Sequence, residues 1–128
     1  MDQTSSNALP AATAKGLAIT IWTLSGVAAL AFLAAGLSKL AGAAAMVAVF
    51  EAVGVGQWFR YLTGVLEVAG GIGLLIPRYS FYAAVLLAAV MVGAVAAHLT
   101  VLGGSPAAPL FLLALTATIA YLRSRQAL

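Results

Sequence analysis

The stretch TGVLEVAGGIGLLIP, residues 63–77, decides how this chain can fold. Its glycines and aliphatic side chains suit the hydrocarbon interior of a membrane, yet Glu67 stands in the middle of them. An ionised side chain that is buried without a partner is strongly destabilising, so such groups are paired, neutralised or placed in contact with water. The stretch therefore predicts a membrane helix whose carboxylate faces protein or a polar cavity.

The composition of the whole chain is that of a membrane protein. Hydrophobic residues make up 64% of its 128 residues and charged residues only 7%, which is outside the range of soluble domains. Cysteine is absent, which excludes disulfides, thiolate metal sites and thiol nucleophiles. The six Lys and Arg residues stand singly between apolar segments, so they indicate membrane topology and no nucleic-acid partner. The predicted surroundings are the lipid bilayer.

Four apolar segments are long enough to cross a bilayer, or nearly so, since a helix of about 20 residues spans its hydrocarbon. They are residues 16–37, 59–76, 80–102 and 108–122. A signal peptide is the alternative for the first segment, but its apolar core is long and its start is weakly basic. The sequence predicts an all-α fold: a polytopic transmembrane four-helix bundle over residues 16–128, preceded by a flexible N-terminal tail at residues 1–15.

A further short helix is predicted between the first two segments. The apolar residues that share one helical face there are Met46, Val49, Phe50 and Val53. Glu51 lies off this face. An amphipathic helix of this kind is typical of the membrane interface, and a re-entrant fifth span is the alternative.

The distribution of basic residues predicts the topology. Four crossings place both ends of the chain on one side of the membrane. The basic residues of that side outnumber those of the opposite side: they are Lys15, Arg78, Arg123 and Arg125, against Lys39 and Arg60. Because Lys and Arg are enriched in cytoplasmic loops, both termini are predicted to be cytoplasmic and the protein to lie in the cell inner membrane.

The same topology brings the other ionisable side chains to the outer half of the bundle. They are Lys39, Glu51, Arg60, Glu67 and His98. Gly64 and Gly71 flank Glu67 on its own helix, and a second stripe of small residues runs along the third segment around Gly93. Because small residues let membrane helices approach closely, these glycines are predicted to line helix contacts and Glu67 to face protein.

We expect an outer-half pocket with Glu67 at its floor and His98 near its mouth. Glu67 and His98 are the predicted catalytic residues, as general acid and as base or relay, in chemistry such as isomerisation, cyclisation or epoxide opening. The predicted substrate-binding residues are Lys39, Glu51, Arg60, Gly64 and Gly71. Apolar walls with a few convergent polar groups suit a lipophilic small molecule with a polar head, such as a quinone or isoprenoid.

The same polar cluster has a purely structural alternative. Lys39 and Arg60 balance Glu51 and Glu67 in formal charge, so the cluster would also serve as a neutral network that fixes the register of the helices. A metal site is not predicted, because the chain has one His and no Cys. No cofactor motif is evident either, so any redox role needs a borrowed molecule such as a quinone.

Three stretches together resemble the DoxX/DoxX-like family of small four-helix membrane proteins. They are FLAAGLSKLAG at 32–42, FEAVGVGQWFRYLTGVLEVAGGIGLLIP at 50–77 and LLAAVMVGAVAAHL at 86–99. By position, the characteristic polar residues of the family fall on Lys39, Glu67 and His98. The family takes its name from a subunit associated with a thiosulfate:quinone oxidoreductase, so the resemblance implies a quinone-linked or accessory role.

Two other classes of function are open. The chain would act as a non-catalytic subunit that docks an extracytoplasmic redox partner through residues 46–53, or that pairs with a second copy of itself. A transporter or proton path has the least support, since the inner halves of the second and third segments offer no polar residues to continue such a path.

Overall fold

The computed structural model describes residues 10–126, and this part of the chain is helical with no strand. Its elements are α1 (Ala11–Ala41), α2 (Ala44–Val53), α3 (Gln57–Leu74), α4 (Pro77–Ala97), the π-helical turn η2 (His98–Leu102) and α5 (Ala107–Gln126). The predicted all-α class is confirmed.

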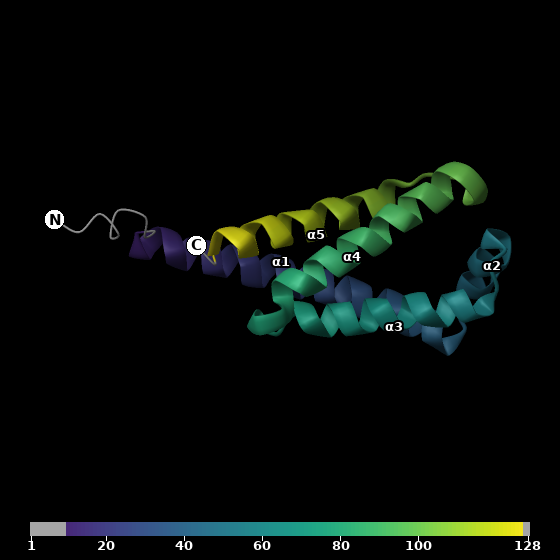
Figure 1. Cartoon of the computed structure of the whole chain (residues 1–128), viewed down its shortest axis with the longest axis horizontal. Helices are drawn as coiled ribbons and strands as arrows, with labels where there is room; N and C mark the ends of the chain where they lie inside the picture. Colours follow the sequence, from purple (N-terminus) through teal and green to yellow (C-terminus); the bar gives the residue numbers. More distant parts are fainter. Residues whose placement is uncertain (1–9, 127–128) are drawn as a thin grey trace.

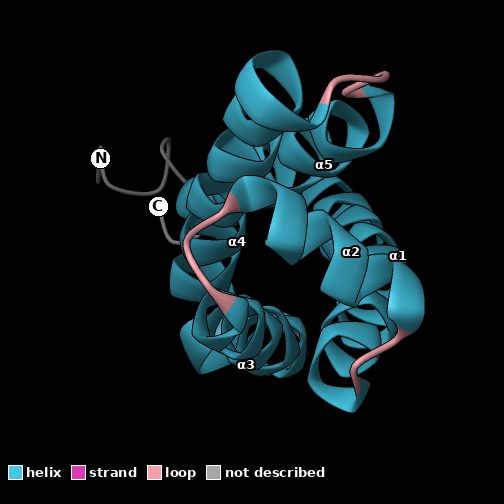
Figure 2. Ribbon diagram, turned by 90° about the vertical axis from the view of Figure 1, so that its right-hand side faces the viewer, coloured by secondary structure: helices cyan, strands magenta, loops and turns pink. Residues whose placement is uncertain are grey.

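The four long helices α1, α3, α4 and α5 form an elongated bundle (Figure 1). Helix α1 packs against α3 and α5, and α4 packs against the same two helices from the opposite corner. Short connections make neighbours antiparallel, the usual up-and-down arrangement of such bundles. Figure 2 views the bundle from one end, with α2 in front and the long helices behind it. We call this the α2 end, and the opposite end, where α5 finishes, the Arg123 end.

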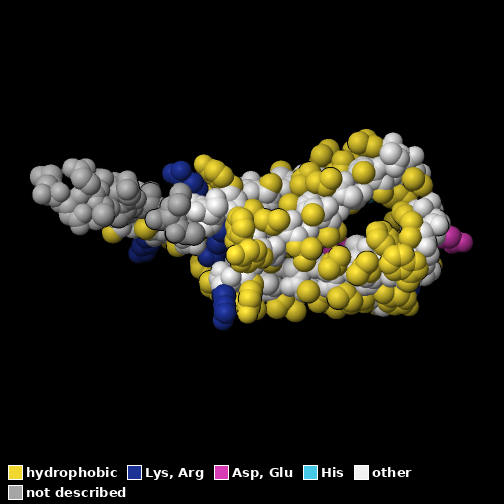
Figure 3. All heavy atoms as spheres, in the orientation of Figure 1, with side chains coloured by type: hydrophobic (Ala, Val, Ile, Leu, Met, Phe, Trp, Pro, Cys, Tyr) yellow, Lys and Arg dark blue, Asp and Glu magenta, His cyan; other side chains and the backbone are white. Residues whose placement is uncertain are grey.

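Three helical segments of the described chain are long and apolar enough to cross a membrane: Ala11–Ala41, Pro77–Leu102 and Ala107–Gln126. Helix α3 does not join them, because Arg60, Glu67 and several glycines lower its hydropathy. Hydrophobic side chains cover the outside of the bundle (Figure 3), as a lipid-facing surface requires. Four crossings and an interfacial α2 remain predictions.

Helices α1 and α5 are longer than the predicted segments. Helix α1 begins at Ala11 and takes in the last residues of the predicted tail, because Ala and Lys there are good helix formers. Residues 1–9 of that tail lie outside the described residues. Helix α1 ends at Gly42, whose φ of 73° is left-handed backbone that favours glycine. Lys39 therefore lies in the last turn of α1 and is held by helix geometry.

Glycines bring α1 and α3 into close contact. A Cβ added to Gly36 would lie 2.9 Å from the carbonyl oxygen of Gly64, and one added to Gly64 would lie 3.1 Å from that of Gly36. A Cβ on Gly71 would lie 3.2 Å from Leu33 Cγ. The helix contacts predicted for Gly64 and Gly71 are confirmed, and Gly36 is their partner on α1.

The helix contact predicted for Gly93 is wrong. Gly93 is exposed, and a Cβ added to it would meet nothing within 4 Å. Helix α4 packs into the core through a different face, which carries Ala84, Leu87 and Met91. The regular spacing of small residues identified a narrow face of α4, but that face lies on the outside of the bundle.

This difference between the two glycines is testable. Gly71→Leu is expected to lower the free energy of unfolding by about 1 to 3 kcal/mol, because the new side chain overpacks the contact with Leu33. Gly93→Leu is the matched control on an exposed helix face and is expected to leave stability unchanged or slightly higher, since glycine is a poor helix former. Thermal unfolding in detergent compares them, and equal melting temperatures would contradict the packing described.

Candidate functional site

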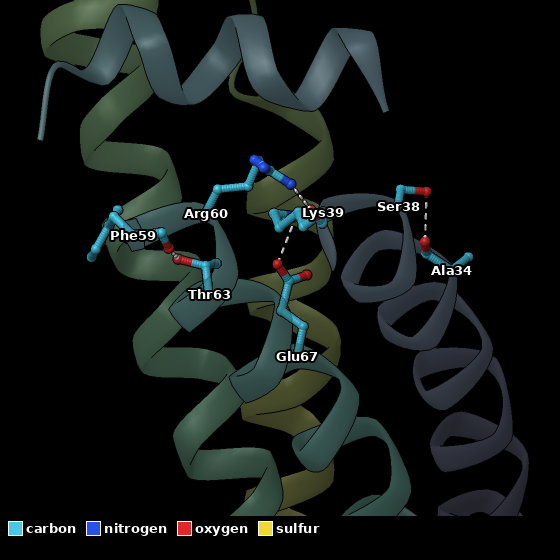
Figure 4. A network of polar contacts seen from close by, with 7 residues as sticks. All are labelled: Ala34, Ser38, Lys39, Phe59, Arg60, Thr63 and Glu67. Carbon is cyan, nitrogen blue, oxygen red and sulfur yellow. Dashed lines mark hydrogen bonds and ion pairs between the residues drawn. The ribbon is translucent and has the colours of Figure 1, made fainter. Parts of the chain in front are cut away.

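A buried ion pair joins α1 and α3 near the α2 end. The Nζ atom of Lys39 lies 2.7 Å from Oε1 of Glu67, as Figure 4 shows. Glu67 is only 1% exposed, and the side chain of Lys39 is 14% exposed. Oε1 has no partner besides this ammonium among the described residues, and a carboxylate oxygen has two lone pairs, so it keeps accepting capacity. Glu67 therefore has a cationic partner, as a carboxylate buried among apolar residues requires.

The glycine contacts explain why these two side chains meet. Lys39 follows Gly36 by one helical turn, and Glu67 follows Gly64 by one turn on α3. Residues three positions apart share a helix face, so the close approach of the glycines carries both side chains into the same interhelical space. Gly64 and Gly71 pack against Leu40 and Leu33 of α1 and position α3, and their part in substrate binding stays a prediction.

Arg60 extends the cluster toward α2. It is 5% exposed, and its Nη1 donates a hydrogen bond to the carbonyl oxygen of Lys39 (Figure 4). Its Nε donates to Oε1 of Gln57 at 2.7 Å, and Nε2 of Gln57 donates to the carbonyl oxygen of Val47 at 3.1 Å. A cation at the C-terminal end of a helix also stabilises its dipole. Arg60 therefore joins the end of α1 to α3 and, through Gln57, to α2.

His98 stands apart from this network in the described structure. It opens η2, is half-buried, and its Nδ1 lies 2.9 Å from the carbonyl oxygen of Ala94 in its own helix. Its carbonyl oxygen accepts a hydrogen bond from the backbone of Gly103, which closes the wide turn. Single π-helical turns are frequent at functional sites. The ring engages its own helix through Nδ1, which leaves Nε2 to meet another group.

The α2 end is hollowed between its elements. Helix α2 contacts η2 as well as α3, so His98 and the Arg60 network belong to the same end of the bundle. The space-filling view shows an opening there, between the segment that runs from α4 into η2 and the α2–α3 segment (Figure 3). Polar side chains from α1 and α3 thus lie near an opening bordered by α2 and η2.

Glu51 lies away from the cluster. It is exposed on α2, whereas its neighbour Phe50 is buried, as the place of Glu51 off the apolar face indicated. In the described part of the chain Lys39 and Glu67 form the ion pair, and Glu51 takes no part in it. The structure therefore brings together Lys39, Arg60 and Glu67 out of the predicted set.

A second polar group, which the sequence reasoning missed, lies at the Arg123 end. Its buried members are Ser25, Ser80, Thr116 and Arg123. The Nε of Arg123 donates a hydrogen bond to Ser80 Oγ at 3.0 Å, and its guanidinium lies 5.6 Å from the centre of the Trp22 ring. Thr116, Ile119 and Arg123 share one face of α5, and this helical spacing was the available signal.

A bundle of apolar helices with a buried ion pair between two of them defines a small helical integral membrane protein. The chain belongs to the DoxX-like family, whose model matches it over residues 23–120. The match covers Lys39, Arg60, Glu67 and His98, and it confirms the resemblance seen in the sequence. No curated protein and no solved structure matches the chain.

Proposed function

We propose that this protein binds a lipophilic small molecule with a polar head, such as a quinone or an isoprenoid, at the Lys39, Arg60 and Glu67 cluster. The observation that carries the proposal is the accepting capacity left on buried Glu67 Oε1 beside a partly exposed Lys39. A ligand hydroxyl would donate to that oxygen, while a ligand carbonyl would accept from the ammonium of Lys39. Apolar helix walls would hold the remainder of the molecule.

The proposal includes the placement of the bundle in the membrane. Helix α3 is the fourth crossing: it packs beside α1 and α4, and both of its charged side chains are buried inside the bundle. Helix α2 then lies at the outer interface with its buried Phe50 toward the protein. In this proposal both termini lie in the cytoplasm, which the basic residues at the Arg123 end favour, and the cluster lies in the outer half of the bilayer.

An acid–base reaction at this site would use the same groups. Glu67 and His98 would move the proton, and Lys39 and Arg60 would stabilise developing negative charge. His98 would act through Nε2, because Nδ1 already meets the carbonyl oxygen of Ala94. The substrate itself would have to bridge the cluster and His98, since these groups share no hydrogen bond in the described residues.

A docking role is the second candidate, and the exposed part of the α2 end favours it. Glu51, Val55 and Trp58 are all exposed there, and the Trp58 side chain is accessible over 60% of its surface. Such a surface would fit an extracytoplasmic redox protein, and co-purification of that protein would favour this candidate. A transport path has less support, because along α1 the apolar Ala28, Ala29 and Phe32 separate Ser25 from Lys39.

The ligand proposal is tested with His98→Ala, because a ligand that bridges the cluster and Nε2 of His98 would lose one polar contact in this variant. The side chain of His98 bonds only to its own helix among the described residues, so the fold is expected to survive the change. Native mass spectrometry of gently purified wild type is expected to show a bound quinone or isoprenoid, and the variant is expected to retain it at least about tenfold less, since one lost charged or polar contact corresponds to that ratio.

Thr100→Ala is the matched control, because Thr100 also bonds to its own helix and lies exposed on η2. It is expected to retain the molecule at the wild-type level. Wild-type protein that carries no lipophilic molecule, and whose melting temperature does not rise with added quinone, would contradict the proposal.

A further inference from the structure

The Arg123 end carries a polar site that the ligand proposal does not use. Arg123 is 9% exposed, and two of its guanidinium nitrogens have partners: Nε donates to Ser80 Oγ, and Nη1 donates to Gln126 Oε1 at 2.8 Å. The third nitrogen, Nη2, is covered and has no hydrogen-bond partner among residues 10–126. A buried charged donor without an acceptor is destabilising, so this arginine favours an anion.

Arg123 borders a groove of about 450 Å³. The groove is lined by Pro77, Arg78, Phe81, Tyr82, Arg123, Ser124 and Gln126. Among the described residues, two arginines and no acidic residue line it, and it includes Pro77, the first residue of α4, where the helix dipole is positive. Lys and Arg side chains gather at this end of the molecule on the face drawn in Figure 3. The groove is therefore cationic.

An apolar groove adjoins the cationic one. It has a volume of about 320 Å³ between α3 and α4 and is lined by Ala69, Gly70, Ile72, Gly73, Ile76, Tyr79, Tyr82, Ala83 and Leu86. Tyr82 lines both grooves, so they adjoin at this residue. Together they offer a cationic site for a head group and an apolar channel for a hydrocarbon chain.

We propose that these two grooves bind an anionic phospholipid, with its phosphate between Arg78 and Arg123 and one acyl chain along the α3–α4 groove. The phosphate displaces the exposed Gln126 side chain from Nη1 and supplies the acceptor that Nη2 lacks. The apolar groove that adjoins the cationic one at Tyr82 favours a phospholipid over free phosphate, because a free ion would use only the cationic groove. Basic pockets between membrane helices are known to suit lipid head groups.

The test measures lipid binding to the detergent-purified protein by native mass spectrometry. The probes are dioleoylphosphatidylglycerol, dioleoylphosphatidylcholine with the same chains, and inorganic phosphate. Phosphatidylglycerol is expected to bind about tenfold more tightly than phosphatidylcholine. Arg78→Gln is expected to weaken phosphatidylglycerol binding about fivefold, the effect of one basic residue near a lipid surface. Arg78 is exposed, so Arg78→Gln keeps the fold, whereas Arg123→Gln changes a buried side chain that donates a hydrogen bond to Ser80.

Two further variants distinguish a lipid phosphate from free phosphate, and a specific site from a general effect of positive charge. Arg125→Gln removes an exposed arginine from the same end that does not border the groove, and it is expected to change binding less than about twofold. Ala69→Phe fills the apolar groove and is expected to weaken phosphatidylglycerol binding while leaving the binding of inorganic phosphate unchanged. Three results would overturn the proposal. They are equal binding of the two lipids, equal effects of the two arginine changes, and binding of inorganic phosphate as tight as that of phosphatidylglycerol.

Discussion

Glu67→Gln is expected to lower the free energy of unfolding by about 3 to 5 kcal/mol, the usual effect of removing one partner from a buried ion pair. Glu67 is 1% exposed, and its Oε1 lies 2.7 Å from the ammonium of Lys39. The amide of Gln keeps the shape of the side chain but removes the negative charge. Lys39 would then hold an unpaired positive charge between α1 and α3. Denaturant or thermal unfolding in detergent measures the loss.

A double-mutant cycle distinguishes the pair from other effects of the substitution. Lys39→Met alone is expected to destabilise the fold by a similar amount, because it leaves the carboxylate unpaired. The double variant Lys39→Met with Glu67→Gln removes both charges and is expected to be more stable than the sum of the single changes by at least about 2 kcal/mol. Glu51→Gln is the matched control on exposed α2 and is expected to change stability by less than about 0.5 kcal/mol.

The opposite result has a definite meaning. A Glu67→Gln protein as stable as wild type would show that the carboxylate does not hold Lys39 as a charged partner. If such a variant also lost its bound lipophilic molecule, Glu67 would act as a neutral acid toward the ligand. A stable variant that retained the ligand would exclude both the ion-pair and the acid role.

Much of the α2 end follows from the sequence. The glycines around Glu67 predicted that its carboxylate faces protein, and the Gly64 contact with α1 confirms the face. The sequence offered Arg60 and Lys39 alike as partners for Glu67, and no pattern separated them. The structure selects Lys39 for the carboxylate, because α1 continues to Ala41 and presents its last carbonyl groups to Arg60.

Other features depend on contacts that no local pattern encodes. The spacing of small residues around Gly93 identifies a narrow helix face, but which helix covers that face is decided by the whole bundle. From the sequence, Arg123 indicates only the membrane topology. Its neighbours in the structure come from other helices: Ser80 from α4 and Trp22 from α1. The π-helical turn that begins at His98 likewise lies where the chain leaves α4 and contacts α2.

Gly36→Leu is expected to reduce stability by about 3 kcal/mol or more and to release the bound molecule as well. A Cβ at this position would lie 2.8 Å from Val68 Cγ2 and 2.9 Å from the carbonyl oxygen of Gly64. Side chains can change rotamer to relieve overpacking, but backbone atoms on the opposing helix cannot, so α1 and α3 must separate. Lys39 and Glu67 each lie one turn beyond this contact, and their 2.7 Å ion pair would lengthen with it.

Gly26→Leu is the matched control for this prediction, since it makes the same change in the same helix where a Cβ meets nothing within 4 Å. It is expected to unfold at or slightly above the wild-type temperature, because leucine is the better helix former. Melting temperature and ligand retention are measured on both variants in the same detergent. Because the glycine contact positions the ion pair, Gly36→Leu should lower both quantities and Gly26→Leu neither. A Gly36→Leu protein that melts lower yet retains its ligand would separate the helix contact from the site and place the ligand elsewhere in the bundle.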